Sequence, residues 1–303
     1  MLPVGKCLNY AGQLEVRSDA AWMRGVVDSD FRDMVAMGFT TLRVPANFER
    51  YTGAGAPYTI DPGFLARVRH VVDAATAAGL NVIIDNHVIE DVLRDPAGQK
   101  ARFTAMWGQI GRAFTDTPAS VSFELMNEPR PPLFNKDLPD YLAPAIAAVR
   151  QTNAKRVIVV GGEWSSGPKS LGSLVLPADP NIVVTVHYYD PIQFTHQGAP
   201  FVSPPLPTGV IWGSAADYAQ LDANVALIKD WMTRTGRVPF VGEYGVYEGV
   251  PLEQRAAYYD DLTHALAGIG VQSCVWGYVN NFPIRNASTW YAPLIAAMAT
   301  TIR

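Results

Sequence analysis

Eight short runs of apolar and β-branched residues recur along the chain, and this repetition most limits the folds that it can adopt. Patterns of helical period lie between these runs, for example at 61–80, 100–114 and 217–236. Strands that are apolar on both faces are typical of a parallel sheet covered by helices. Eight β-α repeats predict a closed (β/α)8 TIM barrel, and the lack of a GxGxxG turn after the first run disfavours a doubly wound sheet. The eight runs span residues 3–9, 40–45, 80–87, 120–129, 156–162, 181–189, 238–245 and 271–277.

Length and composition favour one globular domain over residues 1–303. A barrel of this type needs ~250 residues, and no low-complexity tract or linker divides the chain. The net charge is −4 and lysine and arginine do not cluster, so we expect no nucleic-acid partner. No apolar run approaches the ~18 residues of a membrane helix, so we expect no membrane partner. We expect a monomer.

Polar side chains stand at the carboxyl ends of most of the predicted strands. Taken alone, each has an ordinary explanation: Arg43 could be a structural ion-pair partner, and His87 a hydrogen-bonded core histidine. In a (β/α)8 barrel, however, these strand ends together form the active site. The set comprises Asn9, Arg43, His87, Asn127, Glu128, Glu163, Trp164, His187, Tyr189, Glu243 and Trp276.

Two carboxylates of this set, Glu128 and Glu243, stand out because a closed barrel would place them across one cavity. Glycosidic cleavage needs such a pair, in which one carboxyl group donates a proton and the other stays ionised to attack the anomeric carbon. A metal site would need further ligands, and no HxH, HExxH or DxD cluster accompanies the pair. We therefore expect neither a metal nor another cofactor.

The stretch FELMNEPRPP (123–132) predicts an irregular strand end. Simple alternation would place Asn127 and Glu128 on opposite faces of the strand. For both to reach one sugar, the backbone must leave the ideal pleat, so a bulge or twist is expected there. The prolines that follow lack N–H groups and are expected to end the strand.

Several of these strand ends together resemble glycoside hydrolase family 5, the cellulase family, and bacterial endoglucanases in particular. The matching motifs are TLRVP, NEP, HYYDP and GEYG, with a tryptophan after the eighth run and the segment DPIQFTHQGA. The resemblance implies that Glu128 is the general acid/base and Glu243 the nucleophile of a retaining double displacement. The sequence departs from the family pattern after the second run, where PANFERYTG lacks a tryptophan that many relatives carry.

The resemblance also implies roles for six further substrate-binding residues. Asn127 would bind the sugar 2-hydroxyl, and Arg43 would keep the nucleophile ionised. Tyr189 would lie near the nucleophile and His187 near the acid/base. His87 would face the sugar, and Trp276 would lie under it, followed by a peptide bond that is often cis in the family. The assignment of Asn9 and Glu15 to the glycone side is left open.

Aromatic side chains after strand ends are candidate sugar platforms. Trp164 and Trp212 lie on glycine-containing loops and are expected to line the cleft, whereas Trp107 and Trp231 fall inside amphipathic helices and are expected in the core. His196, in the long segment after the sixth run, could either bind substrate or anchor its loop. Tyr188, Phe194, Tyr247 and Phe282 are further candidates.

The two cysteines, Cys7 and Cys274, lack metal-type spacing. We expect two buried free thiols. A disulfide is the alternative, because a closed barrel would make their two strands neighbours.

The expected function is a retaining endo-β-1,4-glucanase that acts on a β-glucan polysaccharide or oligosaccharide. The alternatives are the same mechanism on mannan, xyloglucan or mixed-linkage glucan, and a non-catalytic glycan-binding barrel. Secretion or a periplasmic location is expected because polymers do not enter cells, although no signal peptide is visible at the start.

Overall fold

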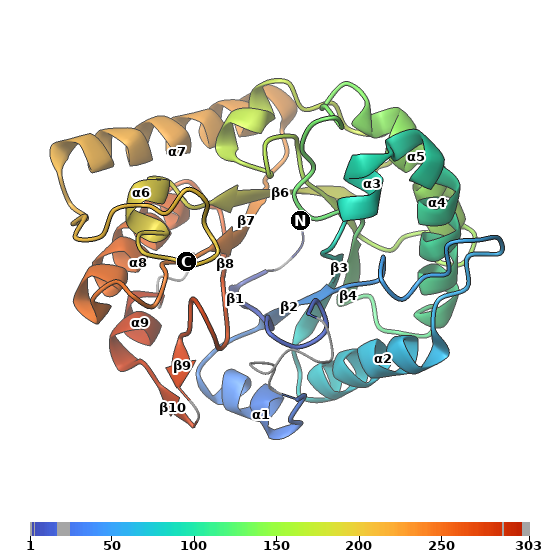
Figure 1. Cartoon of the computed structure of the whole chain (residues 1–303), viewed down its shortest axis with the longest axis horizontal. Coiled ribbons are helices and arrows are strands. Elements are labelled where there is room, and N and C mark those ends of the chain that lie inside the picture. The colour runs from blue at the N-terminus through green and yellow to red at the C-terminus, as the bar shows by residue number, and fades with distance from the viewer. Residues whose placement is uncertain (1, 3, 17–24, 287, 299–303) are drawn as a thin grey trace.

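The computed structural model describes residues 2, 4–16, 25–286 and 288–298, and eight parallel strands of this part form a closed barrel. Each strand pairs with the next, and β8 pairs with β1 to close the ring (Figure 1). The predicted (β/α)8 TIM barrel is therefore confirmed. The strands are β1 (Lys6–Asn9), β2 (Thr41–Ala46), β3 (Asn81–Asn86), β4 (Val121–Glu124), β5 (Ile158–Val160), β6 (Ile182–Tyr188), β7 (Phe240–Tyr244) and β8 (Ser273–Val275).

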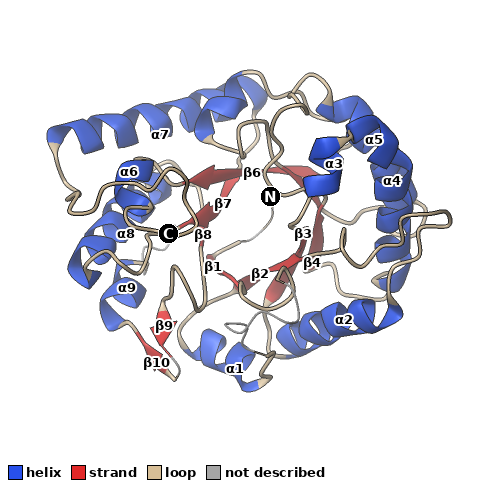
Figure 2. Cartoon of the chain, viewed as in Figure 1, coloured by secondary structure: helices blue, strands red, loops and turns tan. Residues whose placement is uncertain are grey.

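Helices surround the barrel, as Figure 2 shows by colour, and a small antiparallel pair lies outside it. The pair consists of β9 (Arg285–Asn286) and β10 (Thr289–Trp290). None of the helices in the described ranges is long and apolar enough to cross a membrane. The helices are α1 (Ser29–Ala36), α2 (Pro62–Ala77), α3 (Glu90–Arg94), α4 (Pro96–Ala113), α5 (Leu138–Arg150), α6 (Ile192–Thr195), α7 (Ala215–Thr235), α8 (Leu252–Ala267) and α9 (Ala292–Ala297), with a 3₁₀ turn at Pro168–Gly172.

Local signals in the sequence explain where the long helices begin and end. At the start of α2, the side chain of Asp61 accepts a hydrogen bond from the backbone N–H of Phe64. At the start of α7, Ser214 and Asp217 form a capping box. This helix ends at Gly236, whose φ of 66° is the left-handed conformation that glycine adopts without strain.

The barrel interior has two layers of side chains, a polar layer at the carboxyl ends of the strands and an apolar layer below it. The apolar layer is a cluster that includes Cys7, Ile83 and Cys274. Side chains two positions apart on a strand share a face, so the next interior residue on β1 is Asn9 and on β3 is Asp85. The apolar layer thus lies directly below the polar residues at the carboxyl ends of the strands.

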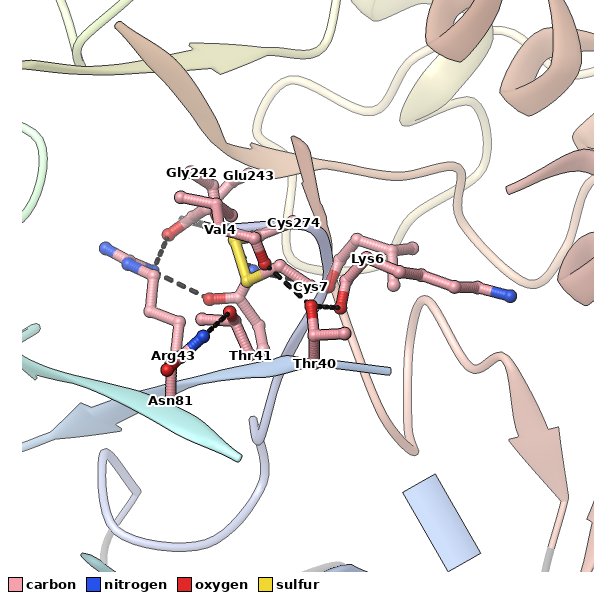
Figure 3. The surroundings of a disulfide bond; sticks show 12 residues. Val4, Lys6, Cys7, Thr40, Thr41, Arg43, Asn81, Gly242, Glu243 and Cys274 are labelled. Carbon is pink, nitrogen blue, oxygen red and sulfur yellow. Dashed lines mark hydrogen bonds and ion pairs between the residues drawn. A yellow bond between two sulfur atoms is a disulfide. The ribbon is translucent and has the colours of Figure 1, made fainter. Parts of the chain in front are cut away.

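Cys7 and Cys274 form a disulfide between the first and last strands, so the expectation of two free thiols is wrong. Closure of the barrel pairs the two residues in register, and both are buried inside it. Their Cα atoms are 4.2 Å apart, which brings both sulfur atoms within bonding distance. Figure 3 shows the bond with Arg43 and Glu243 of the polar layer drawn beside it.

Candidate active site

The segment after β4 carries Glu128 into the mouth of the barrel. The β4 ladder ends at Glu124, although the N–H groups of Leu125 and Asn127 still donate to the neighbouring backbone. The predicted departure from the pleat is present as a left-handed backbone at Glu128, with a φ of 45°, rather than as a bulge within β4. The expectation that the prolines end the strand is wrong, because the ladder has already stopped before Pro129.

Glu128, from the segment after β4, and Glu243, on β7, approach each other across the barrel mouth. An oxygen of each carboxylate and a ring nitrogen of His187 all lie within 4.8 Å of one another. His187 Nδ1 is 3.0 Å from Glu128 Oε1 and 3.5 Å from Glu243 Oε2. The Glu128 side chain is 25% exposed and that of Glu243 only 5%, so the two acids meet solvent very differently.

Arg43 is the centre of a buried polar network beneath the two acids. Its guanidinium donates from Nη1 to Glu243 Oε1 at 2.7 Å, and from Nε and Nη2 to the two oxygens of Glu124, each at 2.7 Å. Its remaining contacts are to Asn9 Oδ1 at 2.9 Å, Asn127 Oδ1 at 2.8 Å and Asp85 Oδ2 at 3.0 Å. A guanidinium suits this position because its donors are held in one plane and stay charged when buried.

The surroundings of Glu243 keep it ionised. Burial alone would raise the pKa of this carboxyl group, but the positive charges of His187, Arg43 and His87 outweigh that effect, and the pKa lies below its usual value. Tyr189 adds a hydrogen bond from its hydroxyl to Glu243 Oε2 at 2.9 Å. Burial and the negative charge of Glu243 raise the pKa of Tyr189 well above its usual value, so the phenol remains a donor.

His87 and Trp276 form one wall of the site. Their rings stack with centroids 5.1 Å apart and planes 9° from parallel. Burial alone would lower the pKa of His87, but Asp85, whose Oδ2 lies 2.7 Å from His87 Nδ1, raises it to about 9. The peptide bond between Trp276 and Gly277 is cis, in agreement with the family expectation.

Glycine is required beside Glu243, at position 242, because side chains of β6 occupy the space that a Cβ would need. A Cβ at Gly242 would come within 2.2 Å of Thr185 Oγ1 and 3.3 Å of His187 Nε2. The absence of a side chain thus lets β7 approach β6 closely enough for His187 to reach both acids.

Glu124 and Asp85 belong to the buried network but are absent from the predicted site. Both lie within the runs expected from the sequence, 80–87 and 120–129, where sequence reading seeks apolar residues, and neither stands at the end of its run. A carboxylate within an otherwise apolar strand is itself a signal, because a fully buried charge requires a partner. Glu124 in FELM could have been found in this way.

The aromatic candidates divide into exposed and buried rings. Trp164, which follows β5, is 61% exposed. The next residue, Ser165, donates a backbone hydrogen bond to Pro129 O, so Trp164 lies next to the segment that carries Glu128. Trp212 is buried, since its ring packs on Tyr258 and its Nε1 donates to Asp261, so the expectation that it lines the cleft is wrong. Tyr188, Phe194 and Phe282 are also buried, and Trp107 and Trp231 lie in the core as expected.

Three polar residues whose roles the sequence left undecided make hydrogen bonds within the protein. Asn9 donates to the carbonyl groups of Gly242 and Val275 and accepts from Arg43. Glu15 accepts from the N–H groups of its own turn, at Gly12 and Gln13. Glu163 anchors a loop, because its carboxylate accepts from Asn135 N and Ser173 Oγ. One exposed ring that sequence reading missed is Phe201, at 51%.

One group of described side chains, Glu128, His187 and Glu243, is compact enough to hold a metal ion. Hydrogen bonds within the protein already engage His187 Nδ1, Glu128 Oε1 and both oxygens of Glu243, the last two through Arg43 and Tyr189. The same three groups suit acid–base and nucleophilic chemistry without an ion.

Comparison with known proteins gives consistent matches to endoglucanases. Endoglucanase H of Acetivibrio thermocellus is 29% identical over 273 residues, which cover 90% of this chain and 29% of that protein. Endoglucanase B of Clostridium cellulovorans is 29% identical over 287 residues, covering 85% of this chain and 64% of that protein. The chain therefore spans 29% and 64%, respectively, of the length of these curated relatives.

Solved structures match over nearly the whole chain. A hyperthermophilic endo-β-1,4-glucanase in complex with substrate has a TM-score of 0.94 and 30% identity, covering 97% of this chain and 96% of that one. Thermotoga maritima Cel5A in complex with cellobiose has a TM-score of 0.93 and 29% identity, covering 97% of each chain. A family model described as cellulase (glycosyl hydrolase family 5) matches residues 10–282. The chain belongs to this family.

Proposed function

We propose that the protein is a retaining endo-β-1,4-glucanase in which Glu243 is the nucleophile and Glu128 the general acid/base. The observation that carries the proposal is the pair of carboxylates, each of which has an oxygen within 4.8 Å of one in the other, in unlike surroundings. Retaining glycosidases hold their two carboxyl groups ~5–5.5 Å apart, whereas inverting enzymes leave ~6.5–9.5 Å for a water molecule. The close approach supports direct attack by one of the two acids.

In the first step Glu243 attacks the anomeric carbon while Glu128 protonates the departing glycosidic oxygen. Arg43, His187 and His87 keep the nucleophile ionised, and Tyr189 holds one of its oxygens in place. Glu128 is the more exposed acid, so it can reach a leaving group that departs toward solvent. In the second step the ionised Glu128 removes a proton from water, which attacks the glycosyl-enzyme ester and releases Glu243.

Neighbouring residues bind and orient the reacting sugar. Arg43 donates to Asn127 Oδ1, so the amide N–H₂ of Asn127 is directed to the substrate and can donate to the sugar 2-hydroxyl. Trp276 offers an indole face to the sugar ring, and His87 stacks on it. The exposed indole of Trp164 lies next to the Glu128 segment, where it can stack on a sugar of the leaving chain.

β-1,4-Glucan is the substrate that the relatives favour. One matching solved structure is that of an endo-β-1,4-glucanase in complex with substrate, and Thermotoga maritima Cel5A has been solved with cellobiose and with mannotriose. The mannotriose complex keeps β-mannan as a second candidate. The Cys7–Cys274 disulfide supports export, because such bonds persist in oxidising compartments such as the periplasm and the exterior.

Hydrolysis of carboxymethyl-cellulose by the wild type, Glu128→Gln and Glu243→Gln tests the assignment. We expect both variants to lose activity by at least about a thousandfold, since each removes a group that the chemistry requires. Near-wild-type activity of either folded variant would refute its role. A parallel assay on β-mannan decides between the two substrates.

A further inference from the structure

His196 is a partly exposed histidine in the long segment between β6 and α7, directly after α6. Its ring meets those of Tyr189 and Phe282 edge to face, with centroids 5.1 Å away in both cases. Because Tyr189 donates to Glu243, the imidazole lies one aromatic ring away from the nucleophile. Sequence reading left open whether this histidine binds substrate or anchors its loop.

The hydrogen bonds around Thr195 determine which nitrogen of His196 carries the proton. Thr195 Oγ1 is 2.6 Å from the carbonyl oxygen of Tyr189 and 2.9 Å from His196 Nδ1. A carbonyl oxygen can only accept, so the single hydroxyl proton of Thr195 is donated to Tyr189. The proton of the second hydrogen bond must then come from the imidazole. His196 is therefore protonated on Nδ1.

The second nitrogen of the same ring is a hydrogen-bond acceptor. Burial against neighbouring rings lowers the pKa of His196 to about 4, so the imidazole is neutral at ordinary pH. A neutral imidazole that is protonated on Nδ1 has a lone pair on Nε2. Within the described ranges, the hydrogen bond of this ring is made by Nδ1, and Nε2 makes none to a protein group.

His87 shows the opposite arrangement in the same mouth of the barrel. Asp85 holds the pKa of His87 at about 9, so this ring is a cation and both of its nitrogens are donors. The mouth thus presents a histidine that donates, beside Trp276, and one that accepts, beside Tyr189. Sugar hydroxyl groups can meet both, since each can donate and accept.

Building on the proposed function, we propose that His196 is a substrate-binding residue whose unprotonated Nε2 accepts a hydrogen bond from a glycan hydroxyl beside the nucleophile. Phe201, 51% exposed and 6.1 Å from the His196 ring between centroids, supplies an apolar surface next to this acceptor. A flat apolar face together with a directed polar atom is the usual composition of a ligand site. A histidine that served as a loop anchor alone would need Nδ1 but not an accessible lone pair on Nε2.

The tautomer can be measured directly by ¹⁵N–¹H correlation NMR of the histidine side chains in the wild-type protein. The inference predicts a neutral ring with its proton on Nδ1 at mildly acidic pH. A proton on Nε2, or a charged ring, would overturn it. Thr195→Val removes the hydroxyl that accepts from Nδ1, and we expect the tautomer preference of His196 to weaken in this variant.

The substrate contact is tested with three variants, His196→Gln, His196→Asn and His196→Phe, assayed on cellotetraose. Glutamine can place an amide oxygen near the position of Nε2, whereas asparagine is too short and phenylalanine has no acceptor. We expect kcat/KM to fall about 3- to 10-fold in His196→Asn and His196→Phe, mainly through KM, as loss of one neutral hydrogen bond implies. His196→Gln should stay within about twofold of wild type.

The possible outcomes separate this inference from the proposed function. A wild-type protein that hydrolyses no β-glycan refutes the proposed function. An active wild type with unchanged kcat/KM in His196→Asn and His196→Phe overturns the His196 contact alone. Equal losses in all three variants with a lowered melting temperature indicate a loop anchor and also overturn it. The matched control is His70→Gln, at an exposed position of α2, and it should leave kcat/KM unchanged.

Discussion

The disulfide between Cys7 and Cys274 gives a stability prediction whose size follows from its position in the chain. The two residues are separated by 267 positions, so the bond closes a loop that includes nearly the whole barrel. The loop-entropy relation gives a stabilisation of about 5–6 kcal/mol at room temperature for a loop of this length. The entropy of unfolding of a chain of 303 residues is about 0.6 kcal/mol per kelvin, so reduction should lower the melting temperature by about 8–9 °C.

The perturbation is complete reduction in denaturant followed by refolding with reductant present, so that the same side chains remain in the barrel. Calorimetry or circular dichroism then compares the melting temperatures of the oxidised and reduced forms. The double variant Cys7→Ala/Cys274→Ala is the control, because its melting temperature should not respond to reductant. A difference below about 2 °C between oxidised and reduced wild type would refute the loop-entropy reasoning for this bond.

Three further predictions concern the active site. Tyr189→Phe removes a hydrogen bond that lowers the pKa of Glu243, the proposed nucleophile. That pKa should rise, and the acid limb of the kcat/KM profile should move up by about one pH unit; an unmoved limb would contradict this. The imidazole of His87 should titrate near pH 9 by NMR, and Asp85→Asn should lower its pKa because burial then dominates; an unchanged midpoint would argue against this cause. Gly242→Ala should cost about a hundredfold in kcat by displacing His187, whereas Gly172→Ala, where a Cβ meets nothing within 4 Å, should match wild type.

The barrel could be predicted from the sequence because eight apolar runs alternate with patterns of helical period along the chain. Every strand recurs as an apolar run, and the helices between them carry their own start and stop residues, such as Asp61 and Gly236. It could also place Glu128 and Glu243 in one site, because the topology of a closed parallel barrel collects all carboxyl strand ends at one mouth. The prediction that Glu128 and Glu243 lie close together, although they are far apart in the sequence, followed from the barrel topology alone.

Other features depend on three-dimensional contacts that a linear pattern does not contain. Trp212 lies on a glycine-containing loop, yet that loop folds back so that the indole packs on Tyr258 of α8. Glu124 looks like an anomaly inside a strand until Arg43 of β2 is seen beside it. The proline expectation failed because the regular strand β4 ends at Glu124, before the prolines are reached, and only single hydrogen bonds from Leu125 and Asn127 continue beyond it.

The central claim is a double displacement through Glu243, and the anomeric configuration of the first product tests it most directly. Proton NMR can follow a soluble cello-oligosaccharide during the first minutes of hydrolysis, before mutarotation mixes the anomers. Two successive displacements at one carbon retain configuration, so we expect the β-anomer of the new reducing end to appear first. Initial release of the α-anomer would show inversion and would contradict the role assigned to Glu243.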